Sequence, residues 1–519
     1  MAGITITGNN NMSALDPSTI LNGTITTNNS TTLTITATNG TVYTLTGNFT
    51  GGSGSTFPTG GAITGWTSSA TDGSAVNIVN LDLAVSKFDH DLHANNGSAL
   101  LHNIFAGADN FHVQDGTGND IISGYSGNDQ FMMAANFTST DSINGGAGYN
   151  TVYLNGDYSS GLTLNDDSLI NIRDLSLRGN HNYNITTTDD AVAAGKTLLV
   201  DASQLTTGDA LMFNGSAETT GRFDFQLGSV VDSTIIGGSG DNVFNGAGSG
   251  NNTLDGGAGN DKFIFGNGFD GTDTINGGGG YNTVYLSGDY SSGVTFGASS
   301  LVNIQRLVLE GNAGGDNYNV TLNAANVTSG DTLRIVGHNT DSSNDLTVDA
   351  SATSGKLVFV GGVSTDTFTG GSGDNVFQTG SGVENLTGGG SSDRFVFSSV
   401  ANSTGPTFDT IDSFNAMNDH FVLGTQITGI DAAVSTGSLS AATFNADMTA
   451  DLGSTQLTAN HAVLFTPNAG TYAGDTFLVV DSNGQAGYTA GQDIVVELNG
   501  ATNLGSLGSH NFYYHDYAG

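Results

Sequence analysis

A single large apolar residue recurs at nine-residue spacing in three stretches of the chain, with glycines before it. Residues 256–264 read Gly-Gly-Ala-Gly-Asn-Asp-Lys-Phe-Ile, which puts Asp261 in the sixth place and Phe263 in the eighth. Glycines at the first, second and fourth places permit positive φ and close backbone approach, so six residues can form a tight turn. The last three residues make a minimal strand whose apolar side chain points inward. The pattern predicts short strands joined by glycine turns.

The same nine-residue pattern occurs in several consecutive copies. Further copies are 115–123, 124–132, 237–245, 247–255, 268–276 and 277–285, with a poorer cluster over 370–396. The sixth place is Asn instead of Asp at Asn150, Asn242, Asn252, Asn282 and Asn375. Fixed short periods are typical of repeat architectures in which neighbouring units stack and bury a continuous core.

A longer repeat contains these blocks. Residues 141–154 return as 273–286, and Tyr149 and Tyr281 lie 132 positions apart. The segment Gly-Gly-Ser-Gly-Asp-Asn-Val-Phe at 237–244 returns at 370–377. The chain therefore consists of two similar units of about 130 residues, with a distinct head and a distinct tail.

Short apolar runs between and before the blocks predict further strands. Leu198-Leu199-Val200 and Leu357-Val358-Phe359-Val360 are bounded by Gly, Asn or Asp, which favours strands joined by turns. In the head, polar and apolar residues alternate through 32–36 and 42–46. We expect the inserts to add strand-and-turn rungs to the stack, and the head and tail to cap it.

These patterns predict an all-β fold: parallel β-roll or β-helix solenoid segments, interleaved with β-rich repeat inserts and capped by β-rich N- and C-terminal domains. The expected domains are the head (1–104), a first repeat block (105–154), an insert (155–236), a second block (237–286), a second insert (287–369), a third block (370–397) and the tail (398–519).

Composition and charge exclude several classes of protein. The chain has 519 residues, with 10 Lys+Arg against 48 Asp+Glu and a formal net charge of -38. A nucleic-acid binder needs cations to displace counterions from phosphates, and these are nearly absent. With no Cys, disulfides, thiolate metal sites and a cysteine nucleophile are excluded. No apolar run approaches the roughly 18 residues that span a bilayer.

The glycine turns also predict a metal chemistry. Turn carbonyl oxygens and the sixth-place carboxylate can converge on a hard cation, and Ca²⁺ takes about six to eight such oxygen ligands. Amide oxygens carry no charge, so we expect weak or absent sites where Asn replaces Asp.

The run of nonapeptides resembles the RTX (haemolysin-type calcium-binding repeat) proteins, over about 105–153, 237–285 and 370–397. The resemblance implies a parallel β-roll that holds several Ca²⁺ ions between neighbouring turns. The candidate ligands and turn glycines are Asp109, Asp115, Gly116, Gly118, Asp120, Gly127, Asp129, Asp141, Gly238, Gly240, Asp241, Asp255, Gly257, Gly259, Asp261, Gly271, Asp273, Gly371, Gly373, Asp374, Asp393, Asp409 and Asp412.

Two other clusters have a second interpretation. Residues 89–93 (Asp-His-Asp-Leu-His), with His102, could form a transition-metal site, although a surface strand with scattered histidines is favoured. Asp481 to Gly484 with Asp493 could form a Ca²⁺ loop, but the twelve-residue helix-flanked pattern is absent and a plain turn is favoured.

No enzyme signature is present, so we predict that the protein is not an enzyme. None of the ten His is followed by Glu, which removes His-Glu-x-x-His, and Gly-x-Ser-x-Gly is absent. A repeated module with one Trp, Trp66, makes a poor carbohydrate cleft.

The two ends of the chain predict the route of export. The N-terminus has neither the basic start nor the apolar core of a secretory signal, and its first basic residue is Lys87. Residues 406–423 resemble the segment that closes an RTX block, and 475–498 resemble the tails of type I secreted proteins. This resemblance implies an uncleaved C-terminal signal and a type I secretion apparatus as partner.

We therefore predict a secreted, extracellular or cell-surface protein that folds on binding Ca²⁺ and self-assembles into a surface layer, filament or matrix. The predicted partners are further copies of the chain and, at the surface, a polysaccharide. The alternative is a calcium-rigidified adhesin that binds a glycan or another surface.

Overall fold

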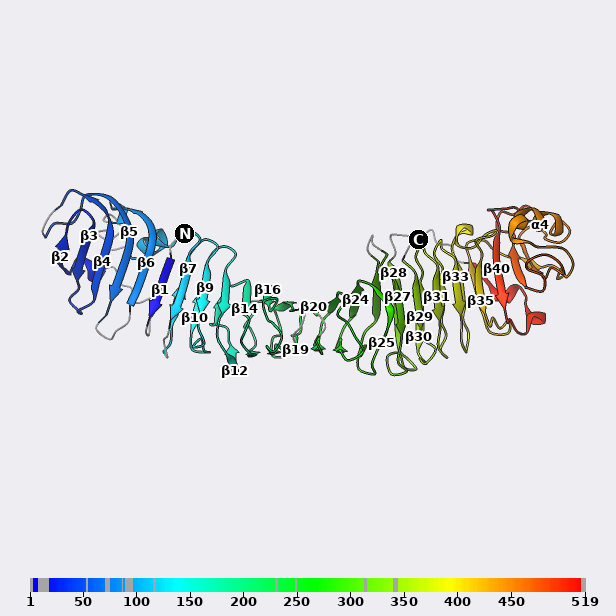
Figure 1. The fold of residues 1–519 in the computed structure, drawn as a ribbon, viewed down its shortest axis with the longest axis horizontal. Helices are drawn as coiled ribbons and strands as arrows, with labels where there is room; N and C mark the ends of the chain where they lie inside the picture. Colours follow the sequence, from blue (N-terminus) through cyan, green and yellow to red (C-terminus); the bar gives the residue numbers. More distant parts are fainter. Residues whose placement is uncertain are drawn as a thin grey trace. The chain divides into compact units, whose positions relative to one another are not determined.

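The computed structural model describes residues 3–7, 18–52, 55–70, 75–85, 87–88, 97–114, 118–228, 232–247, 250–311, 315–338 and 344–514. The described regular structure is mostly β-strand, as the sequence predicts, and its helices are short. The chain divides into two compact units, Met1–Gly259 and Asn260–Gly519. Within each unit most strands are parallel and stack as successive rungs (Figure 1).

An antiparallel sheet forms the head of the first unit. Its elements are β1 (Gly3–Thr7), α1 (Ser18–Leu21), β2 (Thr24–Asn28), β3 (Thr32–Thr36), β4 (Val42–Thr50), β5 (Gly60–Ser69), β6 (Ala75–Ala84) and α3 (Gly97–Ile104). Strands β2 to β6 pair in sequence order as a meander. β1 pairs antiparallel with β6 and parallel with β7 (Asn110–Gln114), the first rung of the solenoid. The head therefore caps the stack through β1.

One parallel ladder runs through both the repeat block and the insert of the first unit. It continues from β7 with β9 (Gln130–Met133), β11 (Thr151–Leu154), β14 (Asp174–Leu177), β16 (Thr197–Asp201), β18 (Arg222–Gln226) and β20 (Val243–Ala247). Each strand pairs in register with the next, so that the apolar side chains form a column. The fully buried members of this column are Phe111, Phe131, Val152, Leu175, Val200, Phe225 and Phe244.

The chain crosses between successive rungs through strands on a second face. These are β8 (Ile121–Ser123), β10 (Ser142–Asn144) and β13 (Leu169–Ile170), then β12 (Tyr158–Leu164), β15 (Tyr183–Thr187), β17 (Leu211–Asn214), β19 (Ser233–Ile236) and β21 (Thr253–Asp255). Their pairing is parallel as well. The inserts are thus further rungs of the solenoid.

The second unit repeats this construction. One ladder holds β22 (Lys262–Phe265), β24 (Thr283–Ser287), β26 (Arg306–Glu310), β28 (Thr332–His338), β30 (Lys356–Val360), β32 (Val376–Gln378), β34 (Arg394–Phe397), β36 (His420–Leu423) and β41 (Phe512–Tyr514). The other face holds β25 (Tyr290–Thr295), β27 (Tyr318–Thr321), β29 (Leu346–Asp349), β31 (Asp366–Thr369), β33 (Glu384–Thr387), β35 (Asp409–Asp412) and β40 (Ile494–Asn499), with β23 (Thr274–Asn276) before them.

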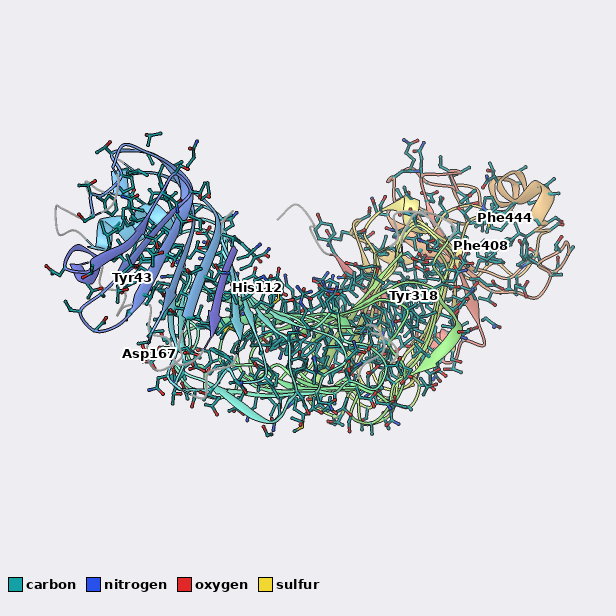
Figure 2. All side chains as sticks on the ribbon, turned by 60° about the vertical axis from the view of Figure 1, so that its left-hand side comes forward. Tyr43, His112, Asp167, Tyr318, Phe408 and Phe444 are labelled. Atoms are coloured by element: carbon teal, nitrogen blue, oxygen red, sulfur yellow. The ribbon has the colours of Figure 1, made fainter. Side chains whose placement is uncertain are left out.

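A small C-terminal domain caps the second unit. It contains β37 (Gly429–Ile430), α4 (Phe444–Asp451), β38 (His461–Phe465), β39 (Phe477–Val480) and four short 3₁₀ helices, η2 (Val400–Asn402), η3 (Ala441–Thr443), η4 (Leu504–Ser506) and η5 (Ser509–Asn511). β40 pairs parallel with β35 and antiparallel with β39. Phe408 stacks on Phe444 at 5.5 Å between ring centroids, in a core that α4 shares with β38 and β39 (Figure 2).

Candidate metal centres

The sixth-place side chains of the nonapeptides turn inward although they are polar. Each exposes at most 4% of its surface, because the preceding turn folds over it. The buried set is Asp109, Asp120, Asp129, Asp141, Asn150, Asn242, Asn252, Asp261, Asp273, Asn282, Asn375 and Asp393. A polar group is buried at low cost only when hydrogen bonds or an ion compensate it.

One oxygen of these side chains ties each rung to the rung before it. Asp129 Oδ1 accepts the backbone N–H of Asp109 at 2.9 Å, and Asn150 Oδ1 accepts that of Asp129 at 2.9 Å. Asp393 Oδ1 accepts the N–H of Asn375 at 2.8 Å in the same way. The ladder explains why both Asp and Asn suit the sixth place: each supplies an acceptor at that point.

The second carboxylate oxygen of Asp129 faces the turn. Asp129 Oδ2 is buried and has no hydrogen-bond partner among the described residues. A methyl group added at Gly124, in the first place of the same nonapeptide, would collide with this oxygen and lie 3.0 Å from the carbonyl oxygen of Gly145. Gly388 stands in the same relation to Asp393 Oδ2. At Asp129 a carboxylate oxygen thus shares a small cradle with a backbone carbonyl oxygen.

The electrostatics of this cradle favour a cation. Burial raises the pKa of Asp129 to about 7, and the charge of Asp109 adds to the effect. Burial likewise raises the pKa of Asp393 to about 7. A buried carboxylate is stabilised by a proton or by a hard cation, and carboxylate and carbonyl oxygens are the ligands that Ca²⁺ accepts. The residues present fit Ca²⁺.

Asp141 and Asp273 are buried like Asp129, but protein donors occupy their second oxygen. Asp141 Oδ2 accepts the Thr138 backbone N–H at 2.7 Å and its hydroxyl at 3.2 Å. Asp273 Oδ2 accepts the N–H of Asp270 at 3.0 Å. These two carboxylates close their own turns, which leaves them less to offer an ion.

A column of three buried acids lies on the other face of the second unit, in and beside the third block. Asp366 opposes Glu384 across β31 and β33, and Asp409 Oδ1 accepts the Glu384 N–H at 3.0 Å. Glu384 Oε2 and Asp409 Oδ2 are buried without a hydrogen-bond partner in the described part of the chain. Burial, followed by the charge of Glu384, raises the pKa of Asp409 to about 10.

Asp366 and Glu384 were not among the residues predicted from the sequence. The nine-residue spacing was available as a signal, since Phe368 and Leu386 keep the eighth place. The glycines are incomplete, however: Ser364 takes the fourth place of one unit and Thr379 the first of the next.

Several predicted ligands lie away from the buried ladder. Asp241 and Asp374 are exposed on their turns, and Asp374 accepts the Ser392 N–H at 3.1 Å. Asp255 Oδ1 accepts the Gly257 N–H at 3.0 Å, and Asp412 Oδ1 accepts Asn499 Nδ2 at 2.6 Å. Asp115 and Gly116 are outside the described residues.

The predicted glycines shape the turns. Gly257 and Gly259 have φ of 91° and 105°, and a methyl group at Gly259 would lie 2.6 Å from the Gly240 carbonyl oxygen of the preceding rung. Side chains there would separate the rungs. Turns of the predicted repeats also contain Gly118, Gly127, Gly238, Gly240, Gly271, Gly371 and Gly373.

The outcome differs for the two other sequence candidates. Residues 89–96 lie outside the description, so the cluster at 89–93 remains a prediction. The oxygens of Asp481 and Asp493 accept local donors, including Gly484 N–H at 2.9 Å and Thr489 N–H at 2.7 Å, as in a plain turn. Within the described residues, no group of three or more His, Asp or Glu side chains is arranged so that it could hold a metal ion.

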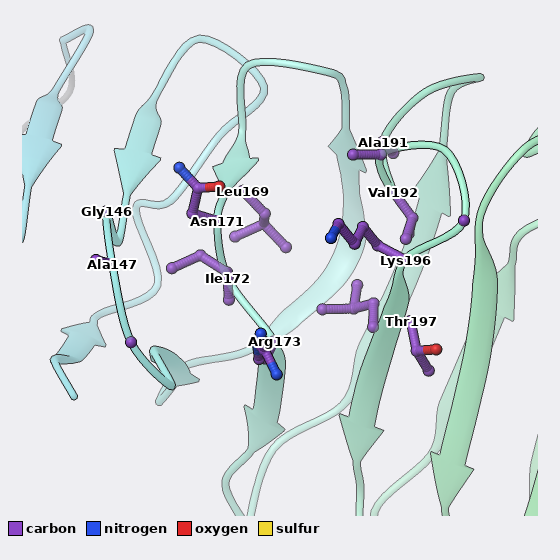
Figure 3. Close-up of a pocket in the computed structure, with 14 residues that line it drawn as sticks. Gly146, Ala147, Leu169, Asn171, Ile172, Arg173, Ala191, Val192, Lys196 and Thr197 are labelled. Atoms are coloured by element: carbon purple, nitrogen blue, oxygen red, sulfur yellow. The ribbon is translucent and has the colours of Figure 1, made fainter. Parts of the chain in front are cut away.

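A pocket of about 530 Å³ opens beside the first insert (Figure 3). Leu169, Ile172 and Val192 line it, and Arg173 and Lys196 stand around it. Both cations are exposed, and the whole chain has only ten Lys and Arg.

Among the described residues, no helix has the length and apolarity to cross a membrane. No curated protein and no solved structure matches the chain. The family model described as the RTX calcium-binding nonapeptide repeat (4 copies) matches residues 105–132, 236–271, 247–284, 267–289 and 360–395. These ranges contain Asp129, Asp393 and the pair Asp366 and Glu384. The chain is therefore an RTX-repeat protein.

Proposed function

We propose that the chain is a secreted structural protein that becomes rigid when Ca²⁺ fills its Asp-bearing turns outside the cell, and then assembles with further copies of itself into a surface layer, filament or matrix. The observation that supports this most is the buried oxygen of Asp129, which lacks a described partner and lies inside the solenoid stack. An ion there is part of the core, so its binding energy is also folding energy.

Calcium concentration would then separate two states of the chain. Extracellular Ca²⁺ modules have dissociation constants of about 10⁻⁴–10⁻³ M, far above cytosolic levels. Inside the cell the stack stays loose enough for type I secretion, and in a millimolar medium it closes.

The head supports assembly with other copies. β2 pairs with β3 alone among the described strands, and it contains only uncharged residues, Thr-Ile-Thr-Thr-Asn. Residues 1–86 hold three Asp and no Lys or Arg. Edge strands without charges or proline are templates for pairing with another chain. Contacts of this kind that do not close produce filaments or sheets.

The test compares purified protein in millimolar Ca²⁺ and in excess chelator. We expect a cooperative β-type circular dichroism spectrum and ordered assemblies in electron micrographs with Ca²⁺, and in chelator a weaker β signal, a lower thermal midpoint and no assemblies. A spectrum that chelator leaves unchanged contradicts calcium-dependent folding, and a protein that stays monomeric at high concentration in Ca²⁺ contradicts assembly.

The pocket beside the first insert favours a second candidate function, an adhesin for an acidic glycan. Arg173 and Lys196 place two cations beside an apolar-lined hollow. A glycan array in Ca²⁺ separates the candidates: binding of acidic glycans that Lys196→Ala abolishes, by a protein that does not assemble, favours the adhesin.

A further inference from the structure

Two of the Asn-bearing turns, those of Asn242 and Asn375, contain the same cradle as the turn of Asp129, but a protein group fills it. Asn375 Nδ2 donates to the carbonyl oxygens of Gly388 at 2.8 Å, Gly373 at 2.9 Å and Gly371 at 3.1 Å. These carbonyls belong to the second and fourth places of its own nonapeptide and the first place of the repeat in the next rung. The amide nitrogen therefore lies at the centre of three inward carbonyl oxygens.

Asn242 repeats this arrangement in the first unit. Its Nδ2 donates to Gly240 O at 2.7 Å, Gly256 O at 3.0 Å and Gly238 O at 3.4 Å, from the same three places. Its Oδ1 accepts the Phe223 N–H at 2.9 Å, which orients the amide with its nitrogen toward the carbonyls. In two separate turns, an asparagine amide nitrogen thus donates to the same three carbonyl positions.

The cradle is the same one that holds the carboxylate oxygen of Asp129. A methyl group at Gly237 would contact Asn242 Nδ2 at 2.7 Å and collide with the Gly256 carbonyl. The corresponding methyl group at Gly124 would meet Asp129 Oδ2 and the Gly145 carbonyl. The one difference in chemistry is that an N–H donor attracts carbonyl oxygens, whereas a carboxylate oxygen repels them until a cation intervenes.

We propose that the turns of Asn242 and Asn375 are calcium-independent, because the asparagine amide takes the place of the ion. The solenoid then contains permanently closed turns beside turns that close only with Ca²⁺. This inference rests on the proposed calcium-dependent folding and identifies which turns carry it. The closed turns would keep the glycine corners in register before any ion arrives.

The experiment exchanges the two residue types and counts ions. Bound Ca²⁺ per chain is measured by equilibrium dialysis, and the thermal midpoint is measured in chelator by circular dichroism. We expect Asn375→Asp to gain one ion and to have a lower midpoint in chelator, with recovery in Ca²⁺. We expect Asp129→Asn to lose one ion and to have a higher midpoint in chelator.

Asn319→Asp is the matched control. Asn319 is exposed on β27, so this substitution adds the same negative charge outside a glycine turn. Failure of Asn375→Asp to fold in chelator, with refolding in Ca²⁺, also supports the proposal. It is overturned if Asn375→Asp gains no ion and melts like the control, or if Asp129→Asn keeps the wild-type count. All readings are made on dilute monomer, so a wild type that binds Ca²⁺ without assembling contradicts only the proposed assembly.

Discussion

Asp129 and Asn242 occupy the same place in their turns. They differ in the atom that faces the cradle, which is a carboxylate oxygen in Asp129 and an amide nitrogen in Asn242. Both side chains accept a backbone N–H from the preceding rung. Asp129 then brings a negative oxygen to the cradle, and Asn242 brings a donor. The spacing of the sequence predicts which side chains turn inward, because the period places them after the glycines. It predicts an Asn only as a weakened ligand, because the three carbonyls around its nitrogen come partly from another rung.

Filling the cradle of Asp129 should remove its ion without touching the carboxylate. Gly124→Ala puts a methyl group against Asp129 Oδ2 and the Gly145 carbonyl, so we expect one Ca²⁺ fewer per chain. The free energy of unfolding in Ca²⁺ should fall by about 1–3 kcal/mol. Equilibrium dialysis and thermal unfolding measure the two effects. Gly107→Ala is the control, since nothing lies within 4 Å of its added methyl group. Equal ion counts in the two variants would contradict the cradle.

A second residue-scale difference concerns acids that share the spacing but not the surroundings. Asp141 occupies the sixth place of its nine-residue unit, as Asp129 does, yet Thr138 donates to its second carboxylate oxygen. No nine-residue pattern encodes this, because the donor comes from the shape of the individual turn. Conversely, Glu384 lacks a first-place glycine and was missed, although it is as buried as Asp129.

Each nonapeptide strand is too short to be stable alone, and stacking supplies what it lacks. Phe377 lies between Phe359 and Phe395, with ring centroids 5.0 and 5.1 Å away and interplanar angles of 11° and 8°. Neighbouring strands of a sheet are about 4.7–4.9 Å apart, so the rings follow the rise of the backbone. The column was predictable from the eighth place of the repeat. The insert strands were predictable as strands, whereas their register with the block strands depends on rung lengths that differ along the chain.

Truncating the middle of this aromatic column tests its contribution. Phe377→Ala removes a fully buried ring, and we expect a loss of about 3–5 kcal/mol in the free energy of unfolding in Ca²⁺. Val363→Ala, at a side chain 43% exposed just before the third block, should cost far less. Denaturant unfolding followed by circular dichroism measures both. Similar costs for the two variants would mean that the column does not hold the block together.

Protonation of the buried carboxylates at low pH should stabilise the ion-free chain, as Ca²⁺ binding does. Burial raises the pKa of Asp129, Asp393 and Glu384 to about 7, from ordinary values of about 4. For acids whose folded-state pKa is raised, the stabilisation is complete at low pH and is lost as pH rises from about 4 through 7. We therefore expect the ion-free chain to have a higher thermal midpoint at pH 5 than at pH 8.

Thermal scans of calcium-stripped protein in excess chelator test this expectation. Calcium should raise the midpoint more at pH 8, where the carboxylates are ionised, than at pH 5. Asp129→Asn should raise the chelator midpoint at pH 8 and change it little at pH 5. A wild-type midpoint that is the same or higher at pH 8 contradicts the argument.

At the scale of the molecule, each end of the chain meets the solenoid by a pairing distant in sequence. β1 pairs with β7, about a hundred residues away, and β40 pairs with β35 across the C-terminal domain. The sequence predicts that head and tail act as caps, since stacked repeats need them. The sequence does not identify which strands pair with the solenoid, because polar and apolar residues alternate in the same way in every strand of the head. The caps leave β2 at the outer edge of the described head sheet.

If β2 is the contact between copies, a charge on it should block assembly and leave folding intact. Thr26 is exposed on this strand, so Thr26→Lys should not disturb the core. A lysine on an edge strand opposes pairing with another chain, because docking would bury its charge. We expect light scattering and electron microscopy in Ca²⁺ to show monomers, with the thermal midpoint unchanged. Thr347→Lys is the control. Thr347 is also exposed, but its strand β29 is paired on both sides, so assembly should persist. If Thr26→Lys assembles at the same concentration as the wild type, β2 is not the contact between copies. The contact would then lie on the acidic surface of the solenoid, with Ca²⁺ ions bridging neighbouring copies.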